Sequence, residues 1–359
     1  MKRAKVLRRG GMATAGVLGA LAVTHTLRRM GARVLWPAER DEYRDENFAL
    51  IDEDQPGVVF ADDGVSLATR TYGTDAAELT IVFVHGFCNS MESFHFQRRD
   101  LAARYGDRIR MVLFDQRGHG RSGTPTTESC TVQQLGHDVA AVLRECAPSG
   151  PVVLIGHSLG GMAVLAAAAQ FPELFAARVV GVGLFCTTAA EVTSAGLPQL
   201  LRNPAIGGFR LAARTAPAVV QVSRSASKQI VTPFLHVSSF HGPVSPTLSR
   251  FTTMMIDRTP VATIEKFLKA IELHDESAAL AVLAPLPVLI LGGTNDMVIP
   301  FRNSRALAAA LPGSELVRMS KAAHMPHLQY PESTLDAVER LLARAGFGDL
   351  RAAEEVIGG

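Results

Sequence analysis

The feature that most constrains the fold is a series of short apolar runs that alternate with helical patterns along the chain. The clearest runs are LTIVFVHG (79–86), RIRMVLFD (108–115), PVVLIG (151–156), RVVGVGLFCT (178–187) and LPVLILGG (286–293). Continuous apolar runs of this length are typical of strands that are buried on both faces. Helical spacing lies between them, most clearly in VQQLGHDVAAVLREC (132–146). The alternation predicts an α/β fold with a mostly parallel central sheet and helices on both faces.

Segments outside these runs extend the pattern. GVVFADDGVSLATRTYG (57–73) predicts an early hairpin, with Asp62-Asp63-Gly64 as its turn. A helix is expected from Leu159 to Phe171, where Pro172 would stop it. After the last run, residues 304–346 have the pattern of a helix, a strand and a second helix. The expected sheet is therefore large and continues almost to the end of the chain.

Residues 188–276 break the alternation. Prolines and polar stretches there separate apolar helical pieces, such as IGGFRLAARTAPAVVQV (206–222) and TIEKFLKAIELH (263–274). We interpret 188–276 as a helical cap inserted between two core strands. The core domain would then comprise residues 57–187 and 277–350.

The N-terminal segment, residues 1–36, is basic and contains an apolar run. Residues 10–27 include no Asp, Glu, Lys or Arg. As a helix this run would span about 27 Å, just short of the ~30 Å hydrocarbon core of a bilayer. A cleaved signal peptide is the alternative, because Ala20-Leu21-Ala22 resembles a cleavage site. Arg28 and Arg29, soon after the run, favour a retained anchor.

We therefore expect an N-terminal hydrophobic helix outside the core and a protein that is membrane-associated or exported. Residues 37–56, between this helix and the core, are rich in Asp and Glu. We interpret them as an acidic linker.

Charge and cysteine content narrow the range of partners. The formal net charge is +2, but the basic residues of 1–36 account for it, and the rest of the chain is net acidic. A mildly acidic body without a basic stripe argues against nucleic acid as a partner. The four cysteines fit no zinc spacing, so we expect buried apolar fillers. They are Cys88, Cys130, Cys146 and Cys186.

The stretch VVLIGHSLGGMAVLAAAA (152–169) carries the strongest chemical signal. Gly156-His157-Ser158-Leu159-Gly160 matches the pattern G-x-S-x-G and lies between a strand pattern and a helix pattern. In that context the serine lies on a strained turn that exposes its hydroxyl above the sheet. Side chains at the flanking glycine positions would clash there. Ser158 is therefore the candidate nucleophile, and an ordinary turn serine is the alternative.

A serine nucleophile needs a base, and the base needs an acid that orients it. Sites in parallel sheets gather at the carboxyl ends of strands. His324 and Asp296 both follow strand patterns, and the chain order Ser158, Asp296, His324 is the one that accompanies a serine on such a turn. His327 is the rival base. Glu191, after the preceding strand, is the alternative acid.

Backbone N–H groups must bind the negative charge that develops on the carbonyl oxygen during attack. The helix expected after Ser158 would present the N–H of Leu159. The turn after residues 79–86 would direct the N–H of Phe87 or Cys88 to the same point. The residues that flank these groups, which we expect to line the site or support it, are His85, Gly86 and His157.

These motifs resemble those of the α/β-hydrolase family, in its esterase/lipase type within the hydrolase-1 group. The matching pieces are HGF (85–87), DQRGHGRS (115–122), GHSLGG (156–161), G-x-x-D-x-x-x-P (293–300) and HMPHLQYPE (324–332). The resemblance covers roughly residues 58–345. Two positions depart from the family pattern: Ala323 stands where Gly is usual, and Gln329 stands where Glu is frequent.

The resemblance implies an α/β-hydrolase fold and a serine-dependent cleavage of carboxylic esters, without a metal or an organic cofactor. By this resemblance the nucleophile is Ser158, the acid Asp296, the base His324, and the oxyanion donors Phe87 and Leu159. A small lipophilic ester is the expected substrate, because the cap contains the apolar residues Phe209, Leu211, Val219, Val220, Phe234, Leu235, Met254 and Met255. The alternatives are a thioesterase, lactonase, C–C hydrolase, peptidase or cofactor-free perhydrolase, or a protein of this fold that only binds a ligand.

Overall fold

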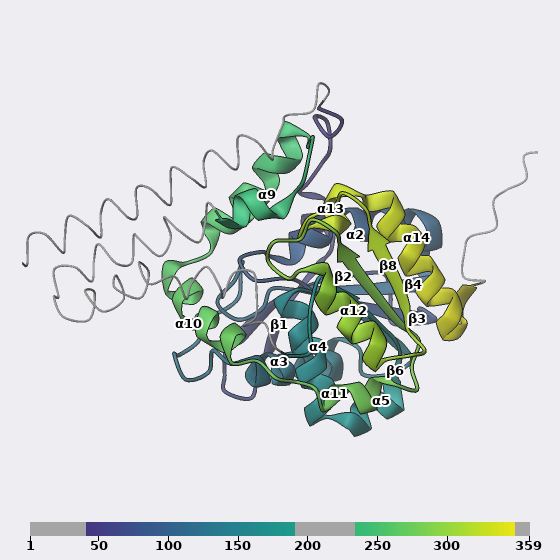
Figure 1. Ribbon diagram of the computed structural model, residues 1–359. Coiled ribbons are helices and arrows are strands. Elements are labelled where there is room, and N and C mark those ends of the chain that lie inside the picture. Colours follow the sequence, from purple (N-terminus) through teal and green to yellow (C-terminus); the bar gives the residue numbers. More distant parts are fainter. Residues whose placement is uncertain (1–40, 191–233, 349–359) are drawn as a thin grey trace, which may run out of the picture.

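The centre of the molecule is an eight-stranded sheet with strand order β1-β2-β4-β3-β5-β6-β7-β8 (Figure 1). The computed structural model describes residues 41–190 and 234–348. The strands are β1 (Gln55–Phe60), β2 (Ser66–Tyr72), β3 (Leu79–Val84), β4 (Ile109–Phe114), β5 (Val152–His157), β6 (Val179–Phe185), β7 (Val288–Gly293) and β8 (Glu315–Met319). β1 and β2 form the predicted hairpin, and β2 also pairs antiparallel with β4. All other neighbouring strands are parallel, so the prediction of a mostly parallel sheet is confirmed.

The strands near the middle of the sheet are buried on both faces. Every residue of β3, β5 and β7 is buried. This burial explains why their sequences are continuously apolar rather than alternating, because helices exclude water from both sides.

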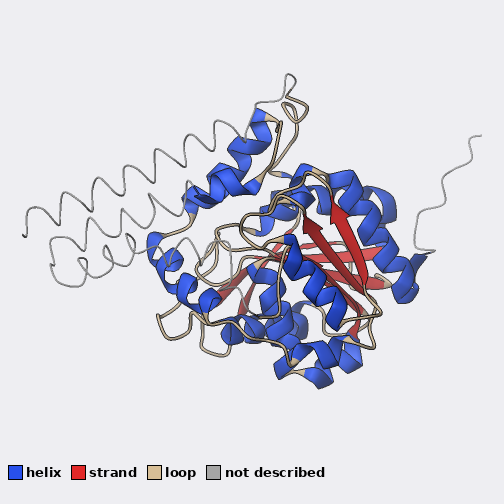
Figure 2. Cartoon of the chain, in the orientation of Figure 1, coloured by secondary structure: helices blue, strands red, loops and turns tan. Residues whose placement is uncertain are grey.

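Helices cover both faces of the sheet (Figure 2). One layer, packed on Val82 and Leu154, contains α3 (Val132–Cys146), α4 (Leu159–Gln170), α5 (Pro172–Arg178), α11 (Ala279–Leu283) and α12 (Phe301–Ala310). The other layer, packed on Ile81 and Ile155, contains α2 (His95–Tyr105) and α14 (Pro331–Leu342). Shorter helical turns are η1 (Leu50–Glu53), η2 (Met91–Phe94), η3 (Gly106–Arg108), α13 (Pro326–Gln329) and η5 (Ala343–Phe347).

Pro172 begins a helix as well as following one. α4 ends at Gln170, close to the predicted end, but Pro172 is the first residue of α5. Proline is tolerated in the first turn of a helix, because the N–H that it lacks would have no helical partner there. The sequence pattern predicts a stop at this position and does not predict the second helix.

The segment predicted as an acidic linker, residues 37–56, packs against the fold over its described part. The ring of Phe48 stacks on Phe251 with centroids 4.1 Å apart, and the Tyr43 ring lies 4.9 Å from that of Phe96. Ile51, in η1, is buried in the core. The linker interpretation is corrected here, because apolar side chains spaced among the acids pack against the rest of the fold.

The described part of the predicted cap is helical. α9 (Pro246–Arg258) and α10 (Val261–Glu272) lie outside the two helical layers of the sheet (Figure 1). The chain leaves the core and returns to it at one point, because Ala190 and Asp275 form an isolated antiparallel bridge. The Glu276 N–H also donates to the Ala189 carbonyl at 2.7 Å.

Some predicted segments lie outside the described residues: the anchor at 10–27 and the cap pieces between 191 and 233. Within residues 41–190 and 234–348, no single helix is long and apolar enough to cross a membrane. α4 and α5 together pass that test of length and composition, with a bend of 99° between them.

Candidate active site

Ser158 lies at the sharp turn between β5 and α4. Its backbone has φ 51° and ψ −117°, a conformation that residues other than glycine rarely adopt. The glycines near Ser158 are required because larger residues would clash there. A Cβ on Gly156 would lie 2.6 Å from the Gly160 carbonyl oxygen, and a Cβ on Gly160 would lie 2.0 Å from the Val84 carbonyl oxygen. The turn therefore needs small residues on both sides of the serine.

Ser158, His324 and Asp296 are joined by hydrogen bonds into one array. The Ser158 hydroxyl donates to His324 Nε2 at 2.9 Å, and His324 Nδ1–H donates to Asp296 Oδ2 at 2.8 Å. The other carboxylate oxygen of Asp296 accepts from the N–H groups of Val298 and Ile299 at 2.8 and 2.9 Å. This pattern leaves His324 Nε2 free to accept a proton. Each member of the array is 6% exposed, so it is nearly but not fully closed to solvent.

His327, the rival base, lies away from the serine hydroxyl. It is fully buried in α13, and its ring centroid lies 4.5 Å from that of His157 and 5.1 Å from that of Phe94. Within the described residues neither of its ring nitrogens has a hydrogen-bond partner. Burial lowers the pKa of His327 to about 3, so the ring is neutral at ordinary pH. Glu191, the alternative acid, lies outside the described residues.

The turn after β3 lies against the first turn of α4. Leu159 is the first residue of α4, and N–H groups in the first turn of a helix have no carbonyl partner within it. A Cβ on Gly160 would lie 2.5 Å from the His85 carbonyl oxygen, so the backbones of the two turns touch. Phe87 and Leu159 are thus on neighbouring turns, which the prediction of a shared oxyanion hole requires.

His85 supports the turn that carries Phe87 rather than lining the site. It is fully buried, its Nδ1–H donates to the Gly86 carbonyl at 2.8 Å, and its Nε2 accepts from the Gln116 N–H at 2.9 Å. The Gln116 side chain donates back to the His85 carbonyl at 2.5 Å. Burial lowers the pKa of His85 to about 3, which keeps the ring neutral. Of the two roles expected for His85, its contacts are those of a supporting residue, because its ring ties the turn after β3 to the loop after β4.

The loop after β4 is held by two buried charged residues. Asp115 accepts from the N–H groups of Met91 and Arg121 at 2.8 and 2.7 Å, and burial raises its pKa to about 7. The Arg117 guanidinium forks onto Asp138, with both bonds at 2.6 Å, and reaches Asp63 at 2.6 Å. We call Arg117, Asp138 and Asp63 the Arg117 cluster. These side chains fix the shape of a loop that borders the site.

Cys186, directly after β6, lies beside the array. Its sulfur, an oxygen of Asp296 and a ring nitrogen of His324 lie within 4.8 Å of one another, so these three side chains could share a metal ion. Asp296 and His324 are, however, joined by their own hydrogen bond. Burial and the Asp296 carboxylate raise the pKa of the Cys186 thiol well above its usual value, so the proton stays on sulfur. The sequence predicts the burial of Cys186 but not its place next to the acid and the base.

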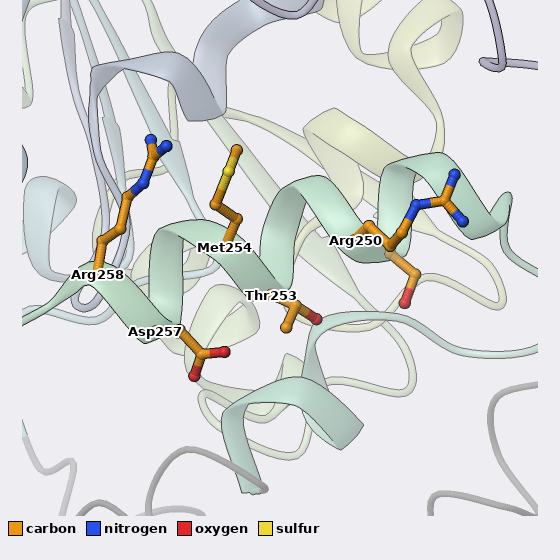
Figure 3. Close-up of a pocket in the computed structure, with 6 residues that line it drawn as sticks. Arg250, Thr253, Met254, Asp257 and Arg258 are labelled. Atoms are coloured by element: carbon orange, nitrogen blue, oxygen red, sulfur yellow. The ribbon is translucent and has the colours of Figure 1, made fainter.

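A separate surface pocket of about 440 Å³ lies along α9 (Figure 3). It is lined by Ser249, Arg250, Thr253, Met254, Asp257 and Arg258, none of which belongs to the array. Met254, expected among the apolar residues of the cap, is 40% exposed here, whereas Met255 is buried. Met254 lies four residues from Arg250 and from Arg258, which places it on the outer face of the helix. Met254 is therefore a surface residue and does not support the expectation of a hydrophobic pocket beneath the cap.

Comparison with protein families identifies the fold. The family model described as the alpha/beta hydrolase fold matches residues 80–331. The chain belongs to the α/β-hydrolase family. The predicted family membership is confirmed, and the match includes both the strained turn at Ser158 and the loop of His324.

The sequence matches between this α/β-hydrolase and its relatives cover most of its length. A pimeloyl-[acyl-carrier protein] methyl ester esterase from Neisseria meningitidis is 27% identical over 261 residues, covering 70% of this chain and 89% of that protein. An uncharacterized protein from Mycobacterium tuberculosis is 26% identical over 294 residues, covering 78% of this chain and 79% of that protein. A solved thermophilic esterase from Thermogutta terrifontis matches with a TM-score of 0.63 and 22% identity, covering 81% of this chain and 99% of that chain. The structural likeness shows a common fold.

Proposed function

We propose that this α/β-hydrolase cleaves carboxylic esters and that the Ser158–His324–Asp296 array is its catalytic triad. The observation that carries the proposal is the unbroken series of hydrogen bonds, 2.9 and 2.8 Å long, that begins at a serine on a strained turn. A serine hydroxyl, an imidazole that can take its proton and an orienting carboxylate are the groups that acyl transfer requires. The methyl ester esterase among the relatives supports an ester as the substrate class.

The geometry suits a two-step reaction through an acyl-enzyme. Ser158 Oγ attacks the acyl carbon while His324 Nε2 takes its proton, and Asp296 stabilises the imidazolium that forms. The N–H groups of Phe87 and Leu159 bind the oxyanion. The imidazolium then gives its proton to the leaving alcohol. In the second step His324 removes a proton from water, which attacks the acyl-enzyme and releases the acid.

The acyl group that we propose is hydrophobic. Phe234 and Leu235, from the segment predicted as the cap, are buried in the same hydrophobic cluster as Phe87 and Leu159. Apolar side chains that line a binding site favour an uncharged acyl chain. Of the other apolar cap residues, Met255 packs in a different cluster, and Phe209, Leu211, Val219 and Val220 lie outside the described residues.

A fluorophosphonate probe and a panel of p-nitrophenyl esters of increasing chain length test this function. We expect the probe to label Ser158 and the rate to rise with acyl length up to a limit. Ser158→Ala should abolish labelling and lower kcat on the order of 10⁴–10⁶-fold. Ser249→Ala, in the α9 surface pocket, is the matched control and should behave as wild type. Equal hydrolysis by wild type and Ser158→Ala would refute the mechanism. Thioesters and lactones in the same panel would reveal a different substrate class on the same triad.

We also propose that residues 10–27 anchor the protein to a membrane. The run has no charged residue of the Asp, Glu, Lys or Arg type, and paired arginines border it at 8–9 and 28–29. The full chain should sediment with membranes, and a chain lacking residues 1–36 should move to the soluble fraction. An unchanged distribution would count against the anchor.

A further inference from the structure

The side chain of His157 reaches from the nucleophile turn to the loop of the base. His157 is the last residue of β5 and immediately precedes Ser158. It is fully buried, and its Nε2–H donates to the backbone carbonyl of His324 at 2.8 Å. Because a carbonyl oxygen only accepts, this bond places the ring proton on Nε2 and leaves Nδ1 unprotonated. One side chain thus ties the backbone of the base to the residue next to the nucleophile.

The Nδ1–Cε1 edge of the same ring packs on the turn that carries Phe87. A Cβ on Gly86 would lie 2.6 Å from His157 Nδ1 and 3.0 Å from its Cε1. No side chain larger than hydrogen therefore fits at Gly86 while the His157 ring keeps its place. The ring is in contact with the base loop on one edge and with the predicted oxyanion turn on the other.

The bond from His157 is insensitive to pH in the range where esters are usually assayed. Burial lowers the pKa of His157 well below its usual value, and the nearby rings of His327 and His324 lower it further. The ring therefore stays neutral, and the Nε2 donor stays in place. The backbone of His324 is also held through its N–H, which donates to the carbonyl of Ser238, in the cap segment, at 3.2 Å.

We propose that His157 is a positioning residue that sets the distance between Ser158, His324 and the oxyanion turn. Its ring joins the three loops that must meet at the reacting carbon, and it does so through a donor and a steric contact rather than through the substrate. The inference rests on the proposed ester hydrolysis, because its effect on rate is measured through that reaction. Misplacing a catalytic group by about 1 Å costs on the order of 10²-fold in rate, which sets the scale of the expected effect.

The test compares one substitution at two adjacent buried histidines. His157→Phe keeps an aromatic ring and removes the donor, and His327→Phe makes the same change where the described residues offer no bond to lose. We expect His157→Phe to lower kcat by about 10- to 100-fold with KM nearly unchanged. His157→Gln, whose amide donates at a similar reach, should recover most of the rate, and His327→Phe should stay close to wild type. Equal losses in His157→Phe and His157→Gln, an equal loss in His327→Phe, or full activity in His157→Phe would each overturn the proposal.

A second measurement separates this inference from the proposed function. Side-chain ¹⁵N spectra of the histidine-labelled full chain report the tautomer of His157 whether or not the protein hydrolyses esters. The bond to the His324 carbonyl requires protonated Nε2, and a His157 ring protonated on Nδ1 would overturn the positioning role. A wild-type protein that neither labels nor hydrolyses esters, yet has the Nε2 tautomer, would instead overturn the proposed function alone.

Discussion

Two groups of hydrogen-bonded polar side chains, the array at the candidate site and the Arg117 cluster in a neighbouring loop, differ in where their hydrogen bonds end. In the Arg117 cluster a fully buried guanidinium is paired on both sides, at 2.6 Å to Asp138 and at 2.6 Å to Asp63. In the Ser158–His324–Asp296 array the bonds end at a hydroxyl on a strained turn. Both contain a buried carboxylate, Asp138 or Asp296, beside a buried basic side chain, so these features do not distinguish them. The Arg117 cluster holds a loop in place, whereas the array ends at the serine that we propose as the nucleophile.

We expect substitutions in the two groups to have opposite effects on rate and stability. Changes in the array should lower the rate and leave the free energy of unfolding nearly unchanged. Changes in the Arg117 cluster should lower the free energy of unfolding and leave the rate per folded molecule nearly unchanged.

The largest effect is expected from Asp296→Asn. The amide oxygen can still accept from the Val298 and Ile299 N–H groups, but the amide nitrogen would face His324 Nδ1 and force the wrong ring tautomer. We expect kcat to fall on the order of 10⁴-fold, as measured by ester hydrolysis. The thermal unfolding midpoint should move little, and a large drop in that midpoint would contradict the assignment of Asp296 to rate rather than to stability.

The next effect is expected from Arg117→Met. This change leaves the buried carboxylate of Asp138 without its guanidinium partner, so the free energy of unfolding should fall by about 3–5 kcal/mol in urea titrations. Arg117→Lys keeps the charge but loses the fork, and it should lose less. When active sites are counted by fluorophosphonate labelling, the kcat per site should stay close to that of wild type. A fall in kcat per labelled site as large as that of Asp296→Asn would break the distinction between the two groups.

The smallest effect is expected from His327→Phe and depends on pH. The pKa of His327 is lowered from 6.5 to about 3, so its neutral ring contributes stability above pH 6.5 that is lost as the pH falls toward 3. The contribution changes by at most about 1.4 kcal/mol per pH unit. The free energy of unfolding of His327→Phe should therefore fall less steeply than that of wild type between pH 6.5 and 4. Parallel curves for the two proteins would contradict the buried neutral histidine.

The sheet could be predicted from the sequence because burial on both faces leaves a continuous apolar run. Helix α2 could not, because its buried residues include His95, Gln97 and Arg98 as well as Phe96 and Leu101. Buried polar side chains remove the apolar stripe by which a helix is recognised. The packing of the acidic segment before β1 could not be predicted for a similar reason, because its few aromatic residues are spaced among carboxylates.

The array could be predicted because each of its residues follows a strand, so the topology alone brings Ser158, Asp296 and His324 to one edge of the sheet. The contacts that support the array could not be predicted from the sequence. Whether His157 reaches the His324 carbonyl, or whether Cys186 lies beside Asp296, depends on the direction of one side chain and the path of one loop. No spacing in the sequence encodes those directions.

The bridge between Ala190 and Asp275 brings together the two ends of the segment inserted after β6. Because the chain departs and returns at one point, the intervening residues can lengthen, shorten or be exchanged without changing the register of β6 against β7. Loop-closure entropy grows only slowly with length, so a change of length by itself costs little stability, whereas the buried residues Ile264 and Phe267 of this segment pack in the core and must be kept. An exchange of this insertion must, however, keep the carbonyl of Ser238, because that carbonyl accepts the His324 N–H and so helps to hold the loop of the array.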